Sequence, residues 1–194
     1  GTPDEFDLDN TINSTANNGG YLDVKMRPER KNRIKLLLFL DVGGSMDPYI
    51  EACEELFSAA RTEFKELEHF YFHNCLYETV WNNNPRSSED IIPTWDILRK
   101  YGSDYRVLFV GDAAMSPYEV AYPGGSIEHW NEESGATWLE RLTSHFDSIA
   151  WLNPESKSIW NSSASNKMIR EIFEDKMFEM NLSGIEEAMK DLSR

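Results

Sequence analysis

The sequence predicts an α/β fold, with a doubly wound, mostly parallel sheet that carries helices on both faces. Short apolar runs recur along the chain, segments with helical periodicity lie between them, and two of the runs end at an aspartate. A strand that is apolar along its whole length is typical of a sheet covered on both sides. Strands that alternate with helices indicate parallel pairing.

Three apolar runs are predicted to be buried strands, at residues 34–40, 107–110 and 148–152. The stretch 69–81 is rich in aromatic and β-branched residues and indicates two strands or one long bent strand. A last strand is expected near residues 177–180.

The first long helix is predicted at residues 48–67, because apolar residues recur there at steps of three and four. Asp47 is interpreted as its N-cap and Pro48 as its first residue. Shorter helices are expected at residues 95–100, after the capping box of Ser116 and Glu119, around 139–146 and around 168–173. A C-terminal helix is expected to be capped by Ser183 and Glu186.

The chain is expected to form one domain over residues 31–194, preceded by a flexible lead-in at residues 1–30. The first twenty residues are rich in Asn, Asp, Thr and Gly and show no hydrophobic period. The chain begins with Gly1 rather than with methionine, so we expect it to be part of a longer protein.

The charge and the cysteines restrict the classes of function. Lys and Arg total 19 against 34 Asp and Glu, for a net charge of −15. So acidic a surface repels phosphate backbones and anionic lipid, so we expect neither nucleic-acid nor membrane binding. Cys53 and Cys75 form no disulfide framework and are read as reduced core thiols. This indicates a cytoplasmic protein.

The most informative stretch is Asp41-Val42-Gly43-Gly44-Ser45, which lies between a predicted buried strand and a helix. In open parallel sheets, ligands bind beyond the carboxyl ends of the strands. Asp112 follows another predicted strand, so it is expected at the same edge as Asp41 and Ser45. Carboxylate and hydroxyl oxygens suit Mg²⁺. The alternative is structural, because Asp and Gly also favour turns and Asp112 could cap the segment after its strand.

Asp41-x-Gly43-x-Ser45 resembles the Asp-x-Ser-x-Ser opening of the metal-ion-dependent adhesion site (MIDAS) in von Willebrand factor A (VWA) domains, which have a Rossmann-like fold. Together with Phe72-His73-Asn74-Cys75 and Val110-Gly111-Asp112-Ala113, this motif is similar to the sequences of the bacterial CoxE-like branch. The resemblance covers residues 34–192. It implies a metal held by Asp41, Ser45, Thr94 and Asp112, although Thr94 could instead cap the helix behind it.

This chain departs from the motif at one position. Gly43 stands where the family has its first serine, so one hydroxyl ligand is absent. We therefore expect Mg²⁺, or Mn²⁺ or Ca²⁺ in its place, to be bound weakly.

The resemblance implies a non-enzymatic module whose cation accepts a carboxylate from a protein partner. CoxE-like proteins are similar to the VWA partners of MoxR-type AAA+ ATPases, so such an ATPase is the expected partner, in protein or cofactor assembly. Two alternatives are a Mg²⁺-dependent hydrolase that uses Asp41, and a metal-free scaffold with a degenerate site.

A second candidate pair is His73 and Cys75, which would share one face of a strand. No further pair of soft ligands completes a zinc site. Catalysis by the thiol would need a third group to orient the histidine.

Overall fold

The structure is a computed structural model that describes residues 4–28 and 32–194. The chain forms two compact units, Gly1–Asn32 and Arg33–Arg194. Each unit has its own secondary structure, and the second contains the sheet predicted from the sequence.

The first unit contains one helix and two antiparallel strands: α1 (Leu8–Asn17), β1 (Asp4–Phe6) and β2 (Met26–Pro28). Asp7 caps α1 by accepting a hydrogen bond from the Asn10 N–H. The Thr11 hydroxyl accepts one from the Lys25 N–H. Asp7 and Thr11 are the buried residues among those described in this unit. No hydrophobic pattern in the sequence predicts these elements, because polar contacts, rather than an apolar stripe, hold them together.

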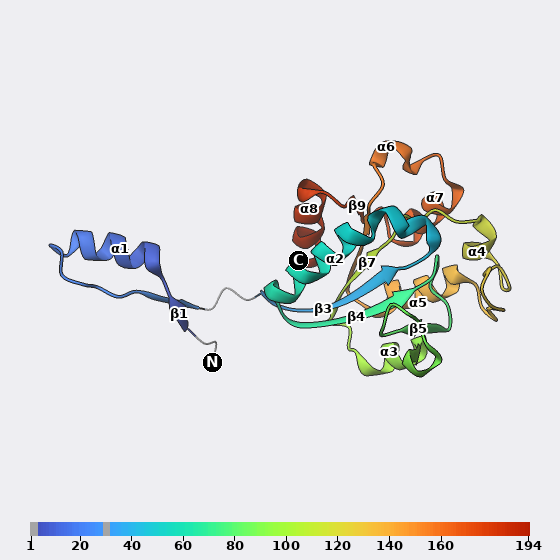
Figure 1. Ribbon diagram of the computed structural model, residues 1–194, viewed down its shortest axis with the longest axis horizontal. Coiled ribbons are helices and arrows are strands. Elements are labelled where there is room, and N and C mark those ends of the chain that lie inside the picture. The colour runs from blue at the N-terminus through green and yellow to red at the C-terminus, as the bar shows by residue number, and fades with distance from the viewer. Residues whose placement is uncertain (1–3, 29–31) are drawn as a thin grey trace. The chain divides into compact units, whose positions relative to one another are not determined.

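The second unit is built on a seven-stranded sheet with the strand order β6-β5-β4-β3-β7-β8-β9 (Figure 1). Its strands are β3 (Asn32–Asp41), β4 (Phe64–Phe72), β5 (Thr79–Trp81), β6 (Ile91–Pro93), β7 (Arg106–Val110), β8 (Ser148–Asn153) and β9 (Met177–Glu179). β3, β7, β8 and β9 pair in parallel, whereas β5 pairs antiparallel with both β4 and β6. The predicted fold class is confirmed.

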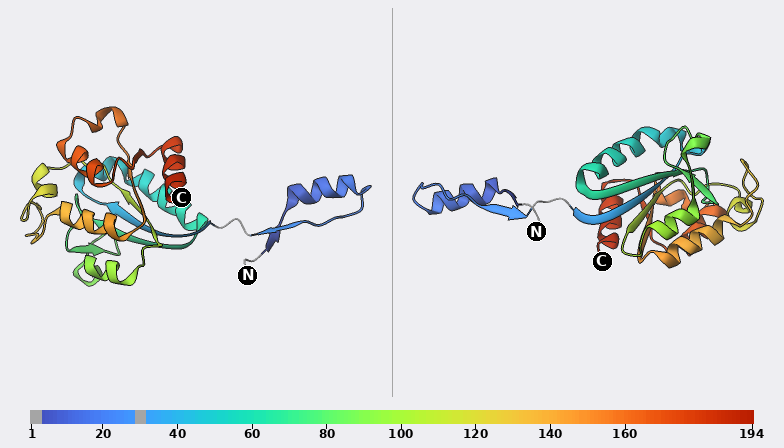
Figure 2. Two further views of the ribbon diagram at one scale, coloured as in Figure 1. Left: turned by 180° about the vertical axis from the view of Figure 1, so that it is seen from behind. Right: turned by 90° about the horizontal axis from the view of Figure 1, so that it is seen from below.

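Helices cover both faces of this sheet (Figure 2). One face packs against α2 (Ile50–Glu63) and α8 (Leu182–Leu192). The other packs against a larger set: α3 (Thr94–Lys100), α4 (Pro117–Ala121), α5 (Gly135–His145), α6 (Lys157–Trp160) and α7 (Ala164–Ile172). Phe109 on β7 stacks between Phe39 and Trp151 on the neighbouring strands, so the largest side chains of the core lie under the centre of the sheet.

The predicted helix at 48–67 was wrong at both ends. Residues Gly44–Tyr49 form a 3₁₀ helix, η1, which contains Asp47 and Pro48, so Asp47 is not the N-cap of the long helix. The helix α2 ends at Glu63, and Phe64 already belongs to β4. Phe64 and Leu67 are apolar because they pack in the core from a strand, where the helical spacing was a coincidence.

The C-terminal helix was also capped differently. Its cap lies two residues earlier than predicted, because Asn181 accepts the Gly184 N–H and α8 begins at Leu182, so Ser183 lies inside the helix. The capping box of Ser116 and Glu119 is confirmed at α4, and α3 begins at Thr94. In the parts of the chain that the structure describes, no helix is both long and apolar enough to cross a membrane.

Candidate metal site

The candidate site lies where four neighbouring strands end. Leu40 pairs with Val110 and Val110 with Leu152, so β3, β7 and β8 end side by side. The Val42 N–H donates to the Phe72 carbonyl, which places the end of β4 next to that of β3. This is the edge at which α/β sheets bind ligands, and Asp41 and Asp112 both lie there, as predicted.

Asp41 ends β3, and only 5 % of its surface is exposed. Its Oδ1 accepts hydrogen bonds from the N–H groups of Gly43, at 2.8 Å, and Asn74, at 3.0 Å. Its Oδ2 is buried and has no hydrogen-bond partner. Burial raises the pKa of Asp41 to about 7, and the charges of Asp112 and Glu119 act in the same direction, against the two backbone hydrogen bonds.

Asp112 follows β7 and is 1 % exposed. Its Oδ1 accepts the Ala114 N–H at 3.1 Å, and its Oδ2 is also buried without a partner. The backbone is held as well, because Asn153 at the end of β8 donates its side-chain N–H to the Asp112 carbonyl. The ends of two neighbouring strands therefore each present one carboxylate oxygen that has no hydrogen-bond donor.

Ser45 lies on η1, four residues after Asp41, and is exposed. The loop from Asp41 to η1 is closed by the bond from the Gly43 N–H to Asp41, and the Met46 N–H donates to the Gly43 carbonyl. Ser45 therefore follows Asp41 in a tight turn, and its hydroxyl is open to solvent.

Thr94 follows a strand that does not neighbour the strands of Asp41 and Asp112. Thr94 follows β6, the edge strand, with β5 and β4 between it and β3. Three strand spacings separate the two strands by about 14 Å. The Thr94 hydroxyl is buried and donates to the Tyr77 carbonyl at 2.5 Å. Pro93, not Thr94, occupies the N-cap position of α3, so the predicted capping role of Thr94 was wrong.

Asn74 and Glu119 also border the site, although the sequence did not predict either of them there. Asn74 donates its side-chain N–H to Glu119 Oε1 at 2.9 Å, and Glu119, on α4, is 4 % exposed. Glu119 Oε2 accepts the Ser116 N–H, so one residue serves both as the end of the capping box and as part of the site. No local pattern in the sequence points to this contact, because the two residues are 45 positions apart.

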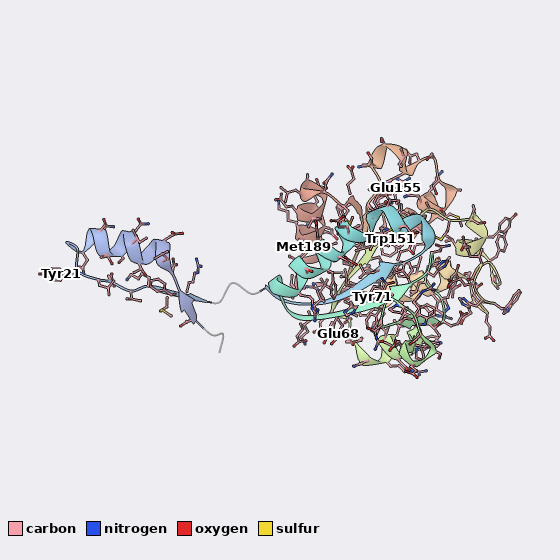
Figure 3. All side chains as sticks on the ribbon, in the orientation of Figure 1. Tyr21, Glu68, Tyr71, Trp151, Glu155 and Met189 are labelled. Carbon is pink, nitrogen blue, oxygen red and sulfur yellow. The ribbon has the colours of Figure 1, made fainter. Side chains whose placement is uncertain are left out.

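A fourth acidic residue borders the site near the end of β8. Glu155 lies just beyond the end of β8, on the segment that leads to α6 (Figure 3). Its N–H donates to Asn153 Oδ1. Burial and the charge of Asp112 raise the pKa of Glu155. Burial, followed by the charges of Glu155 and Asp112, raises the pKa of Tyr49 on η1.

Two buried carboxylate oxygens without donors fit a cation. An unpaired buried charge is costly, and a divalent ion with oxygen ligands would remove that cost. Among the described residues, no group of three or more Asp, Glu, His or Cys side chains is arranged to hold a metal. A cation bound by Asp41 and Asp112 would therefore take its other ligands from neutral oxygens and water.

His73 and Cys75 do not share a strand face. Asn74 between them has a φ of 60°, so the chain turns there and the two residues form an isolated bridge. The His73 imidazole lies 3.4 Å from Glu128, whereas Cys75 is fully buried next to Gly135. Burial raises the pKa of the Cys75 thiol to about 12, which makes it an inert core residue.

A comparison with protein families finds a match over the first part of the chain. Residues 1–87 match the model of the family described as VWA domain containing CoxE-like protein. The match covers less than half of the chain, and it shows that residues 1–87 are similar to this family. It includes Asp41, Ser45 and Asn74 and ends before Thr94, Asp112 and Glu119. No curated protein and no solved structure matched the chain. The second half of the site therefore rests on the geometry described above.

Proposed function

We propose that this chain is a non-enzymatic protein-interaction module that binds a divalent cation between Asp41 and Asp112. The observation that carries the proposal is the pair of buried carboxylate oxygens, one on each residue, that have no hydrogen-bond donor. Glu119 and Glu155 add negative charge nearby, so the local field favours a cation further.

Mg²⁺ is the proposed ion because every candidate ligand is a hard oxygen. Asp41 and Asp112 would hold it directly or through water, and the exposed hydroxyl of Ser45 is available on the same loop. The bound ion would act as a Lewis acid with coordination positions left for water or for an incoming carboxylate. Mn²⁺ and Ca²⁺ take the same type of ligand. Thr94 would contribute indirectly, because its hydroxyl is bonded to Tyr77.

A protein partner is favoured by the surface beside the site. Tyr118, Tyr122, Ile127 and Trp130 lie on α4 or the loop that follows it, and each is more than half exposed. Glu119, between the two tyrosines in sequence, reaches the site through Asn74. Exposed aromatic residues are typical of protein interfaces. A partner could therefore give one carboxylate to the ion and pack apolar groups beside it.

The similarity to CoxE-like proteins suggests a MoxR-type AAA+ ATPase as this partner, in protein or cofactor assembly. Catalysis is not part of the proposal, because a phosphate-transferring site would need a free cation to hold the substrate. Arg86 is already held by both oxygens of Glu128, at 2.6 and 2.9 Å.

Isothermal titration with MgCl₂ and MnCl₂ tests the site. We expect a saturable heat for the wild type, and none for Asp112→Ala. Asp96→Ala is the matched control, because Asp96 is an exposed aspartate on α3 whose ion pair with Arg99 lies on the surface. Equal heats from wild type and Asp112→Ala would refute the proposal. Pull-down of a MoxR-type ATPase in Mg²⁺ and in EDTA then tests the partner, and equal recovery would count against cation dependence.

A further inference from the structure

We propose that the side-chain carbonyl oxygen of Asn74 replaces the serine hydroxyl that the metal-site motif lacks at Gly43. The inference rests on the proposed cation site and adds a ligand that neither the motif nor the family match assigns. It identifies Gly43 and Asn74 as a matched pair, in which the first residue leaves the space that the second one fills.

The space at Gly43 is already occupied. A Cβ atom added to Gly43 would lie 2.1 Å from Asn74 Oδ1 and 3.2 Å from Asp41 Oδ1. The first distance is far below van der Waals contact, so the Asn74 amide oxygen stands where a side chain at position 43 would begin. A serine hydroxyl at this position would lie one bond further on. The Asn74 oxygen therefore reaches the place of the missing ligand from the turn after β4 rather than from the loop after β3.

The backbone of Asn74 is fixed in the required position. Its φ of 60° is in the left-handed region, which asparagine tolerates better than most residues. This turn lets the Asn74 N–H donate to Asp41 Oδ1 at 3.0 Å while the chain passes from His73 to Cys75. Asn74 is thus tied to Asp41, the first residue of the proposed site, through its main chain.

Glu119 fixes which end of the amide faces Gly43. Asn74 Nδ2 donates to Glu119 Oε1, and a carboxylate can only accept. The nitrogen must therefore point to Glu119, which directs the oxygen toward Gly43 and Asp41. Glu119 is itself held by the Ser116 N–H and is almost fully buried. It acts as a positioning residue for Asn74, in the way that outer hydrogen bonds orient metal ligands.

The exchange is chemically conservative. An asparagine carbonyl is a neutral, hard oxygen like a serine hydroxyl, and both are common ligands of Ca²⁺ and related ions. The total charge of the site is unchanged. The departure at Gly43 would then not by itself weaken the affinity, contrary to the expectation from the motif alone.

A swap of the two side chains tests the inference, with MgCl₂ titrated into each protein by calorimetry. Asn74→Gly keeps the left-handed backbone and the N–H to Asp41 but removes the oxygen. We expect it to weaken Mg²⁺ binding about 10- to 100-fold, the range seen when supporting groups of metal sites are lost. Gly43→Ser alone should also weaken binding, because its side chain collides with Asn74. The double variant Gly43→Ser/Asn74→Gly should recover to within a few-fold of the wild type.

The outcomes separate this inference from the proposed site. Absence of Mg²⁺ binding by the wild type would overturn both. Tight binding by the wild type and equally tight binding by Asn74→Gly would overturn only the role of Asn74, as would a double variant no better than Asn74→Gly. A second measurement needs no variant: the assigned side-chain amide resonance of Asn74 in ¹⁵N-labelled wild type should shift on addition of Mg²⁺. An unmoved resonance at saturating Mg²⁺ would also contradict the inference.

Discussion

Two sets of acidic residues in this domain are treated in opposite ways. Glu128 and Glu133 are each paired with an arginine, Arg86 and Arg141 respectively. The arginine hydrogen bond lowers the pKa of each of these two glutamates. Asp41 and Asp112 are more deeply buried, and each keeps one oxygen without a donor. The partly exposed glutamates therefore have arginine partners. The buried aspartates, for which an unpaired charge costs more, each keep one oxygen without a hydrogen-bond donor.

This contrast teaches that the two aspartates are arranged for a positive charge that the chain does not provide. Buried charges in proteins are normally paired or bound to metals. The raised pKa of Asp41 follows from the same lack of a partner, with burial as its main cause. An added cation should lower the pKa of Asp41, as Arg86 lowers the pKa of Glu128.

The largest expected effect is on the pH dependence of stability in the metal-free protein. In EDTA, Asp41 changes its pKa from 3.8 when unfolded to about 7 when folded. The folded state then holds the extra proton between about pH 4 and pH 7, so stability falls as the pH rises through this window. The cost above pH 7 is on the order of 4 kcal/mol.

Asp41→Asn should remove this loss, because its Oδ1 can still accept from Gly43 and Asn74 and the amide carries no charge. We expect the difference in free energy of unfolding between variant and wild type, measured by urea denaturation in EDTA, to grow from pH 4 to pH 7 in favour of the variant. A difference that does not change with pH would show that Asp41 is not the group responsible. Glu128→Gln should show no such gain, because Glu128 is already paired.

The next effect is stabilisation by Mg²⁺. A ligand at 100 times its Kd stabilises the folded state by about 2.7 kcal/mol, which corresponds to a rise in Tm of roughly 5–10 °C for a domain of this size. We expect this rise for the wild type and its loss in Asp112→Asn, measured by calorimetric melting at pH 7.5. An equal rise in both proteins would mean that Mg²⁺ acts at another place.

Thr94→Val should separate stability from metal binding. The substitution leaves the buried Tyr77 carbonyl without the Thr94 hydroxyl, so we expect a loss of about 1–3 kcal/mol in unfolding free energy. The Mg²⁺ affinity of the folded variant should remain within about two-fold of the wild type, because β6, the strand before Thr94, lies about three strand spacings from β3. A ten-fold loss of affinity would instead restore Thr94 as a ligand.

The smallest effect is expected at the paired acids. Arg86→Ala breaks a partly exposed pair with Glu128, which should cost at most about 1 kcal/mol. Melting with and without 0.5 M NaCl should show that salt removes most of the difference between variant and wild type. A loss as large as that predicted for the charge at Asp41 would contradict the contrast between the two sets of acids.

The sequence predicted the part of the site that depends on buried parallel strands. The runs at β3 and β7 are apolar on both faces, so their positions and their aspartates at the carboxyl edge could be foreseen. β6 was missed because it is a three-residue edge strand that ends in proline. It lies at the edge of the sheet, with β5 and β4 between it and β3.

The contact between Asn74 and Glu119 could not be predicted from the sequence. The two residues are 45 positions apart, and their contact depends on a left-handed turn at Asn74 and on where α4 begins. Local sequence patterns do not show that this turn and the start of α4 lie close together. Glu119 was assigned correctly to the capping box, but that role accounts for only one of its two oxygens.

The central claim is that a cation binds between Asp41 and Asp112, and a crystal grown with MnCl₂ tests it most directly. Anomalous difference maps collected at the manganese edge locate the ion without reference to any assumed ligand. We predict one strong peak within coordination distance of an oxygen of each aspartate or of a water bound to it, with Asn74 Oδ1 facing the peak. The absence of a peak between Asp41 and Asp112 at millimolar Mn²⁺ would contradict the account.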